Sequence, residues 1–147
     1  MNEELEQIEK NNTWELVPRP HSKNIIGTKW IFKSTLNENR EVVRNKARLV
    51  CKGYAQQEGI YFEETFAPVA RIQARRMFLA LSSFQKIKVY QMDVKYDFLN
   101  GDLEEEGYIE QPEGFILGND AELVCILKKA LDGLKQAPRA WYYHLDK

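Results

Sequence analysis

The chain has 147 residues, of which 44% are hydrophobic and 29% are charged, and its formal net charge is −1. These values are ordinary for a globular domain, and the length allows a core that buries roughly two thirds of the surface that the unfolded chain exposes. No apolar run is long enough to span a membrane and no apolar segment follows a basic N-terminus, so neither membrane insertion nor secretion is expected.

Charge is strongly segregated along the chain. Residues 19–52 hold nine Lys or Arg against two acids, whereas residues 93–122 hold ten acids against one base. Two solvated faces that partly neutralise each other would give this pattern. A basic arm that contacts phosphates and an acidic centre that gathers divalent cations would give it too, so composition leaves both interpretations open.

The first predicted elements are a short acidic helix and a β-hairpin. The helix covers residues 1–10, and Pro18 and Pro20 prevent any helix directly after it. Residues 28–52 predict a hairpin with its turn at 36–39. Because side chains alternate across a strand, the second strand has an apolar face and a cationic face. The apolar face carries Ala47, Leu49 and Cys51, and the cationic face carries Lys46, Arg48 and Lys52. The cationic face is either the solvated side of the sheet or a surface that binds phosphates.

A loop at residues 53–68 and a helix at 69–85 are expected next. The helix has apolar residues at steps of three or four and arginines largely outside that stripe, which predicts a core-facing helix with a basic outer edge. Cys51 and Cys125 have no second Cys or His near them in sequence, which argues against a zinc site. Buried free thiols and an intracellular setting, cytoplasmic or nuclear, are the expectation.

The central stretch, residues 89–103, is a β-leaning run that ends at Asp93, followed by an aromatic turn and Asn100-Gly101. Asp93 either terminates a strand or presents a functional carboxylate from the strand end. Beyond it, short strands are expected at 108–111 and 123–127, a loop at 112–120, and a helical turn or two at 128–134. A last helix opens near Pro138, and Lys147 is expected to interrupt it.

These stretches resemble the reverse transcriptase of copia-type retrotransposons. The blocks that carry the resemblance stand in the expected order: NNTWELV at 11–17, GTKWIFK at 27–33, NKARLVCKGYAQQEGIYFEETFAPVAR at 45–71, QMDVKYDFLNGDLEEEGYIEQPEGF at 91–115 and GLKQAPRAWY at 133–142. The resemblance implies an α+β fold, with a reverse-transcriptase-like fingers hairpin plus an incomplete palm sheet and packing helices. Residues 1–12 would be a lead-in, residues 13–85 the fingers, and residues 86–147 the N-terminal part of the palm, truncated within a helix.

The resemblance also implies a polymerase site. Asp93 matches the first metal-binding aspartate, and the carbonyl of Val94 would add a ligand to Mg²⁺ or Mn²⁺ in a two-metal nucleotidyl transfer. Phe98 matches the aromatic side chain that presses on the sugar of the incoming nucleotide, a role compatible with an ordinary core position. Lys46 and Arg48 are expected to contact the triphosphate or the template backbone. Contacts to template and primer, or pocket shaping, are expected from Lys52, Gly133, Gln136 and Pro138.

The sequence departs from the family pattern in ways that affect activity. The family's remaining metal-binding acids come from an aromatic-x-Asp-Asp hairpin, and this sequence contains no Asp-Asp pair. The chain alone is therefore expected to be inactive or nearly so. Asp97 and Asp132 add negative charge near a site for a polyanion; the alternative for Asp97 is that it faces solvent and has no effect. Gly107 stands where an apolar side chain would support the following strand.

The expected function is that of a fragment of an RNA-directed DNA polymerase. Its parent would use an RNA template, a DNA primer and dNTPs, together with the missing palm, thumb and RNase H segments. The alternative is a non-catalytic nucleic-acid-binding module or a decayed transposon remnant. An apolar face left exposed where further palm strands would pack predicts poor solubility or dependence on another chain.

Overall fold

The computed structural model describes residues 1–116 and 122–147. Its elements are α1 (Asn2–Lys10), β1 (Trp14–Pro18), β2 (Thr28–Leu36), β3 (Val42–Cys51), η1 (Gly53–Ala55), α2 (Ile72–Phe84), η2 (Asp97–Asn100), β4 (Asp102–Ile109), β5 (Leu123–Lys129) and α3 (Ala137–Leu145). This mixture of helices and small antiparallel sheets is compatible with the expected α+β class. None of the described helices is long and apolar enough to cross a membrane.

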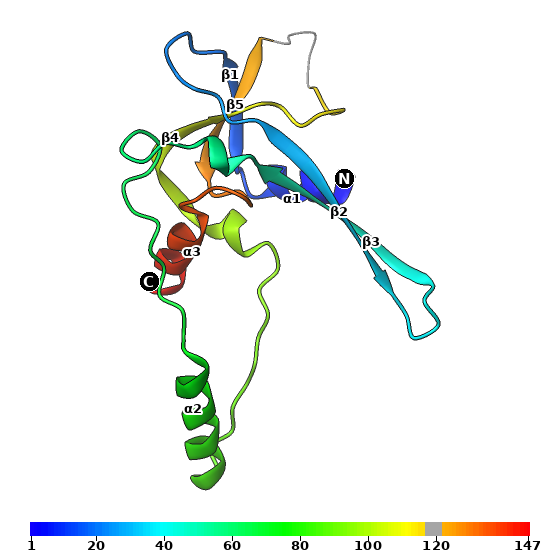
Figure 1. Cartoon of the computed structure of the whole chain (residues 1–147), viewed down its shortest axis with the longest axis vertical. Coiled ribbons are helices and arrows are strands. Elements are labelled where there is room, and N and C mark those ends of the chain that lie inside the picture. Colours follow the sequence, from blue (N-terminus) through cyan, green and yellow to red (C-terminus); the bar gives the residue numbers. More distant parts are fainter. Residues whose placement is uncertain (117–121) are drawn as a thin grey trace.

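A three-stranded antiparallel sheet with the order β1-β5-β4 forms the centre of the molecule (Figure 1). Strand β1 is not predicted from the sequence, because it is only five residues long and ends at Pro18. It pairs along β5 from Trp14 opposite Leu127 to Pro18 opposite Leu123. Pro18 lacks an N–H group and stands at the end of an edge strand, where that loss is tolerated. Strand β4 is longer than the strand expected at 108–111, because the acidic residues before it are part of the strand.

The core lies where this sheet meets α1, β3 and the start of α3. Its buried members include Ile8, Leu49, Ile109 and Leu131. Both cysteines are free and buried, as expected, and burial raises the pKa of the Cys51 thiol to about 12. The core therefore joins the N-terminal helix to segments from both halves of the chain.

The predicted hairpin is confirmed as the pair β2 and β3, with Trp30 opposite Leu49. Its turn is closed by the Asn37 N–H, which donates to the Glu41 carbonyl at 3.0 Å, so the turn lies slightly later than expected. The face prediction for β3 is also confirmed, since Leu49 is buried and Arg48 is exposed. The distal half of the hairpin projects away from the sheet (Figure 1), and Phe32 near it is 67% exposed.

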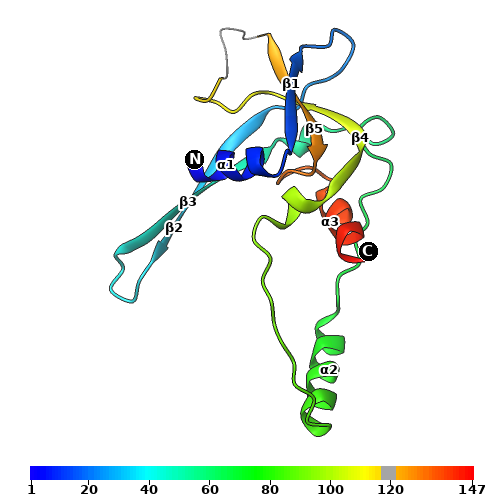
Figure 2. The ribbon, with the colours of Figure 1, turned by 180° about the vertical axis from the view of Figure 1, so that it is seen from behind.

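The helix predicted at 69–85 exists as α2, but the prediction that it faces the core is wrong. Met77 is 72% exposed and Phe84 is 86% exposed. Figures 1 and 2 show α2 standing apart from both sheets at the end of two extended connections. Periodic apolar residues predict a helix and an apolar stripe, but they do not supply the surface that would cover the stripe.

Two further element predictions are corrected by the structure. Residues 89–93 form no strand, because none of the described strands pairs with them and a strand needs hydrogen-bonded neighbours. Residues 128–134 contain no helix, since β5 continues through Lys129 and the next helix, α3, begins only at Ala137. The N–H groups of Lys128 and Lys129 donate to the Thr13 carbonyl, which holds this segment extended.

The remaining C-terminal predictions are largely confirmed. Helix α3 begins at Ala137, with Pro138 in its first turn as predicted, but it ends at Leu145, so the expectation that Lys147 interrupts it is wrong. The expected loop after β4 opens with a turn in which the Phe115 N–H donates to the Pro112 carbonyl at 3.0 Å. Residues 117–120 of that predicted loop lie outside the described residues.

Candidate nucleotide-binding site

A cavity of about 740 Å³ lies between the start of α1, the middle of β3 and residues 93–98. Among the residues that line it are Lys46, Arg48, Asp93, Val94 and Phe98. These are the residues that the sequence assigned to triphosphate, metal and nucleotide sugar. They come from segments about fifty residues apart in the chain, so the tertiary structure alone brings them to one cavity.

Strand β3 supplies the cations on one wall of the cavity. The alternation of the strand places Arg44, Lys46 and Arg48 on one face, while Leu49 and Cys51 anchor the strand in the core. All three cationic residues line the cavity and are exposed. This wall can attract and hydrogen-bond an anionic group.

The segment 93–98 forms the opposite wall. It turns at Tyr96, which has a left-handed conformation with φ of 55°, and the Asn100 Nδ2 closes the turn by donating to the Tyr96 carbonyl at 3.1 Å. Phe98 is half-buried and packs against the core, whereas Asp93 is exposed on the extended approach to the turn. The wall is therefore anchored near Phe98 and open near Asp93.

Helix α1 adds a residue that the sequence reasoning missed, the buried Glu4. Burial raises the pKa of Glu4, and a hydrogen bond with the Leu49 backbone and the charge of Arg48 oppose that rise. Glu4 precedes the buried Ile8 by four residues, so both lie on one face of the helix. That spacing was the available signal for its burial.

Asp132 pairs with Arg48 but does not itself line the cavity. The Arg48 Nη1 donates to the Asp132 Oδ2 at 3.2 Å. Burial raises the pKa of Asp132; Arg48 opposes the rise and the negative charge of Asp97 adds to it. The negative charge of Asp132, which the sequence predicts to be unfavourable, is thus paired with a cation of the site.

The four predicted pocket-shaping residues do not line this cavity. Lys52 is half-buried beside Gly27, and Pro138 is exposed in α3. Gly133 has φ of 90° and approaches the backbone of Cys51 closely. Gln136 is buried, accepts a hydrogen bond from Gln56 Nε2 at 2.9 Å and donates one to the Tyr61 carbonyl at 3.2 Å. Gly133 and Gln136 therefore connect the loop after β3 to the segment that precedes α3.

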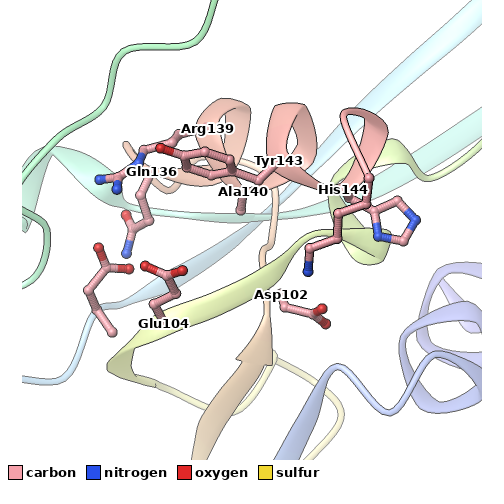
Figure 3. Close-up of a pocket in the computed structure, with 9 residues that line it drawn as sticks. Asp102, Glu104, Gln136, Arg139, Ala140, Tyr143 and His144 are labelled. Carbon is pink, nitrogen blue, oxygen red and sulfur yellow. The ribbon is translucent and has the colours of Figure 1, made fainter.

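A second, smaller cavity of about 140 Å³ lies between β4 and α3, and Gln136 contributes to its lining. Figure 3 shows carboxylates of β4, among them Asp102 and Glu104, facing Arg139 and His144 of α3. The mixture of both charges in a small space favours no particular ligand.

The described residues do not form a metal centre. No group of three or more His, Cys, Asp or Glu side chains in the described part of the chain is arranged to hold a metal ion. Asp93 is exposed and comes from an unpaired segment. The residues present thus do not fit a two-metal site, and no metal-dependent step is assigned to them.

Comparison with known proteins gives concordant results. A family model described as reverse transcriptase (RNA-dependent DNA polymerase) matches residues 11–147. The chain is 48% identical to the retrovirus-related Pol polyprotein from transposon TNT 1-94 of Nicotiana tabacum, over 99% of this chain and 11% of that polyprotein. It is 45% identical to the Pol polyprotein from transposon RE2 of Arabidopsis thaliana, over 92% of this chain and 9% of that polyprotein. No solved structure matches the chain. The chain spans about a tenth of the length of these relatives.

Proposed function

The chain belongs to the reverse transcriptase (RNA-dependent DNA polymerase) family, and we propose that its cavity beside β3 receives the triphosphate of an incoming nucleotide in a copia-type RNA-directed DNA polymerase. The observation that carries this proposal is the presence of Lys46, Arg48, Asp93 and Phe98 in one cavity lining. The family resemblance predicts metal binding for Asp93 and contact with the nucleotide sugar for Phe98, and the cationic face of β3 predicts phosphate binding for Lys46 and Arg48.

The chemistry of the two walls suits a nucleoside triphosphate. Lys46 carries a compact ammonium on a flexible stem, whereas the Arg48 guanidinium can donate two parallel hydrogen bonds to phosphate oxygens. Phe98, held by the core, offers an apolar surface to the sugar on the opposite wall. A polyanion would therefore be drawn to β3 while its nucleoside lies toward Phe98.

We assign the β2–β3 hairpin to a fingers subdomain at 13–85 and residues 86–147 to the first part of a palm. Lys52, Gly133, Gln136 and Pro138 then support the template and primer side from outside the cavity. The RNA template, the DNA primer and Mg²⁺ or Mn²⁺ are assigned to the complete polymerase. Because the described residues form no metal centre, we expect this chain to bind nucleotide without extending a primer.

The test is the affinity of the chain for dTTP at low salt after Lys46→Ala and Arg48→Ala are combined. Loss of both cations should weaken binding about a hundredfold or more, because each charged hydrogen bond contributes about 1.5–3 kcal/mol and about 1.4 kcal/mol is a factor of ten in affinity. The matched control removes two positive charges at Lys86 and Lys88, which do not line the cavity. Unchanged affinity in the cavity variant, or equal losses in both variants, would exclude the proposed site.

A second candidate function is binding of single-stranded nucleic acid without catalysis. The projecting hairpin exposes several cations that a nucleic-acid backbone can reach: Lys29, Lys33, Arg44 and Lys46. Salt-dependent affinity for RNA that persists when dTTP binding is lost would favour this function. Absence of both RNA binding and a cooperative unfolding transition would instead indicate a decayed remnant.

A further inference from the structure

Asp132 holds strand β3 at two points. Its backbone carbonyl accepts a hydrogen bond from the Cys51 N–H at 2.8 Å, and its carboxylate accepts one from Arg48 Nη1 at 3.2 Å. Cys51 and Arg48 are three residues apart on the same strand. The turn after β5 is therefore fixed to β3 by backbone and side chain together.

The exposure of the ion pair differs between its two members. The Arg48 side chain is 55% exposed, whereas that of Asp132 is only 27% exposed. Arginine carries five N–H donors in a rigid planar fork, and Asp132 takes one of them. Because Arg48 lines the cavity and Asp132 does not, the pair anchors one edge of the guanidinium and leaves its other donors available.

We propose that Asp132 is a positioning residue for anion binding, which holds the Arg48 guanidinium at the edge of the cavity and presents its free N–H groups to a phosphate. This inference rests on the proposed function of the cavity as a triphosphate site. Asp132 thereby has a role in the site besides the negative charge that it adds. An anchored guanidinium loses less side-chain freedom when a phosphate binds, and this gain outweighs the repulsion between Asp132 and the phosphate.

Asp97 provides a comparison for that repulsion. It lines the cavity, and it belongs to none of the ion pairs found among the described residues. It is also close enough to Asp132 to affect the pKa of Asp132. Replacing either aspartate by asparagine removes the same charge from the same region, but only the change at Asp132 alters the anchor of Arg48.

The experiment measures binding of inorganic triphosphate and of dTTP to the full chain by calorimetry at low salt. Asp132→Asn should weaken binding of both ligands about fivefold, within the range of coupling energies between contacting residues. Asp97→Asn should strengthen binding, because a negative charge leaves the cavity wall. The two substitutions remove the same charge, but they are expected to change the binding affinity in opposite directions. Stronger binding in Asp132→Asn would overturn the proposal, since Asp132 would then only compete with phosphate for Arg48.

The Arg48→Ala background separates this inference from the proposed function. There, Asp132→Asn should no longer weaken binding, because the side chain it positions is gone. If the double variant with Lys46→Ala and Arg48→Ala binds with unchanged affinity, the proposed function fails. If the double variant binds more weakly but Asp132→Asn alone does not, only the positioning role of Asp132 fails. If Asp132→Asn unfolds the chain, Arg48→Lys is tested instead, because lysine keeps the positive charge but lacks the planar guanidinium that Asp132 anchors. Wild-type affinity in Arg48→Lys would overturn the proposal.

Discussion

Gly133 lies at a tight backbone contact outside the candidate cavity. Its φ is +90°, and an added Cβ would meet the Cys51 carbonyl oxygen and lie 2.6 Å from Val50 Cγ1. We predict that Gly133→Ala lowers the free energy of unfolding by about 2–4 kcal/mol, because strain and a backbone clash act together. Urea unfolding followed by circular dichroism measures the change.

Gly59 is the matched control for this prediction. Its φ is +78°, but an added Cβ would meet no atom of the described residues within 4 Å. Gly59→Ala should therefore cost only about 1 kcal/mol, from the left-handed backbone alone. If both substitutions lower the free energy of unfolding equally, the close approach of Gly133 to β3 does not contribute to the loss of stability.

Gly107 differs from Gly133, because the structure leaves room for a side chain at this position. An added Cβ would lie 3.7 Å from Leu127 Cδ1, which is an ordinary contact, and Gly107 has no positive φ. We predict that Gly107→Ala raises the free energy of unfolding by about 0.5–1 kcal/mol, since glycine in a strand is entropically costly. A lower midpoint in urea would contradict this account of the glycine.

At the scale of elements, the junction of α1 with β3 depends on pH through Glu4. Burial raises the pKa of Glu4, so the folded state holds its proton more tightly than the unfolded state does. This contribution to stability is complete below the pKa of the unfolded state and is lost as pH rises through the folded pKa. We predict that Glu4→Gln stabilises the chain near pH 7 and that the gain shrinks toward pH 4. Thermal unfolding across that range measures it.

Glu3→Gln is the control for Glu4, because Glu3 is exposed and one residue earlier in the same helix. It removes the same charge from the first turn without touching the buried position. A gain at neutral pH that is as large for Glu3 as for Glu4 would assign the effect to the overall charge of α1. The junction with β3 would then play no part in it.

At the scale of the whole molecule, α2 and its connections leave an unusual amount of apolar surface in contact with water. Besides Met77 and Phe84, exposed apolar residues of this part include Phe66, Val69, Phe78, Leu79, Leu81, Tyr90 and Met92. Residues 66–92 contain no acidic residue, so this surface is basic as well as apolar. Large exposed apolar patches promote association, and the chain should aggregate or bind a hydrophobic dye.

Substitution of Met77 and Phe84 by glutamine tests this expectation. Because both side chains are exposed, the double variant should bind less dye and remain monomeric at higher concentration, while its unfolding midpoint changes little. Light scattering and dye fluorescence measure the outcome. Monomeric wild-type chain without dye binding would refute the expectation. A large fall in the midpoint of the variant would show that α2 is packed in solution.

The sequence by itself predicted local structure where the signal is local. Alternation along β3 separated buried Leu49 from exposed Arg48, a three-to-four-residue period located α2, and Pro138 marked the start of α3. The blocks of residues that resemble reverse transcriptases also indicated the family, which the comparisons establish. These inferences hold because strand and helix periodicity and motif spacing are properties of neighbouring residues.

Only the tertiary structure decided which surfaces meet. It left residues 89–93 without a partner among the described strands, placed α2 apart from the core, and added β1 to the sheet beside β5. It also paired Arg48 with Asp132, 84 residues away along the chain, and buried Glu4 against β3. Burial and ion pairing depend on distances through space, which periodicity in the sequence does not report. The sequence therefore determined the elements and the family, and the packing of those elements determined the geometry of the candidate site.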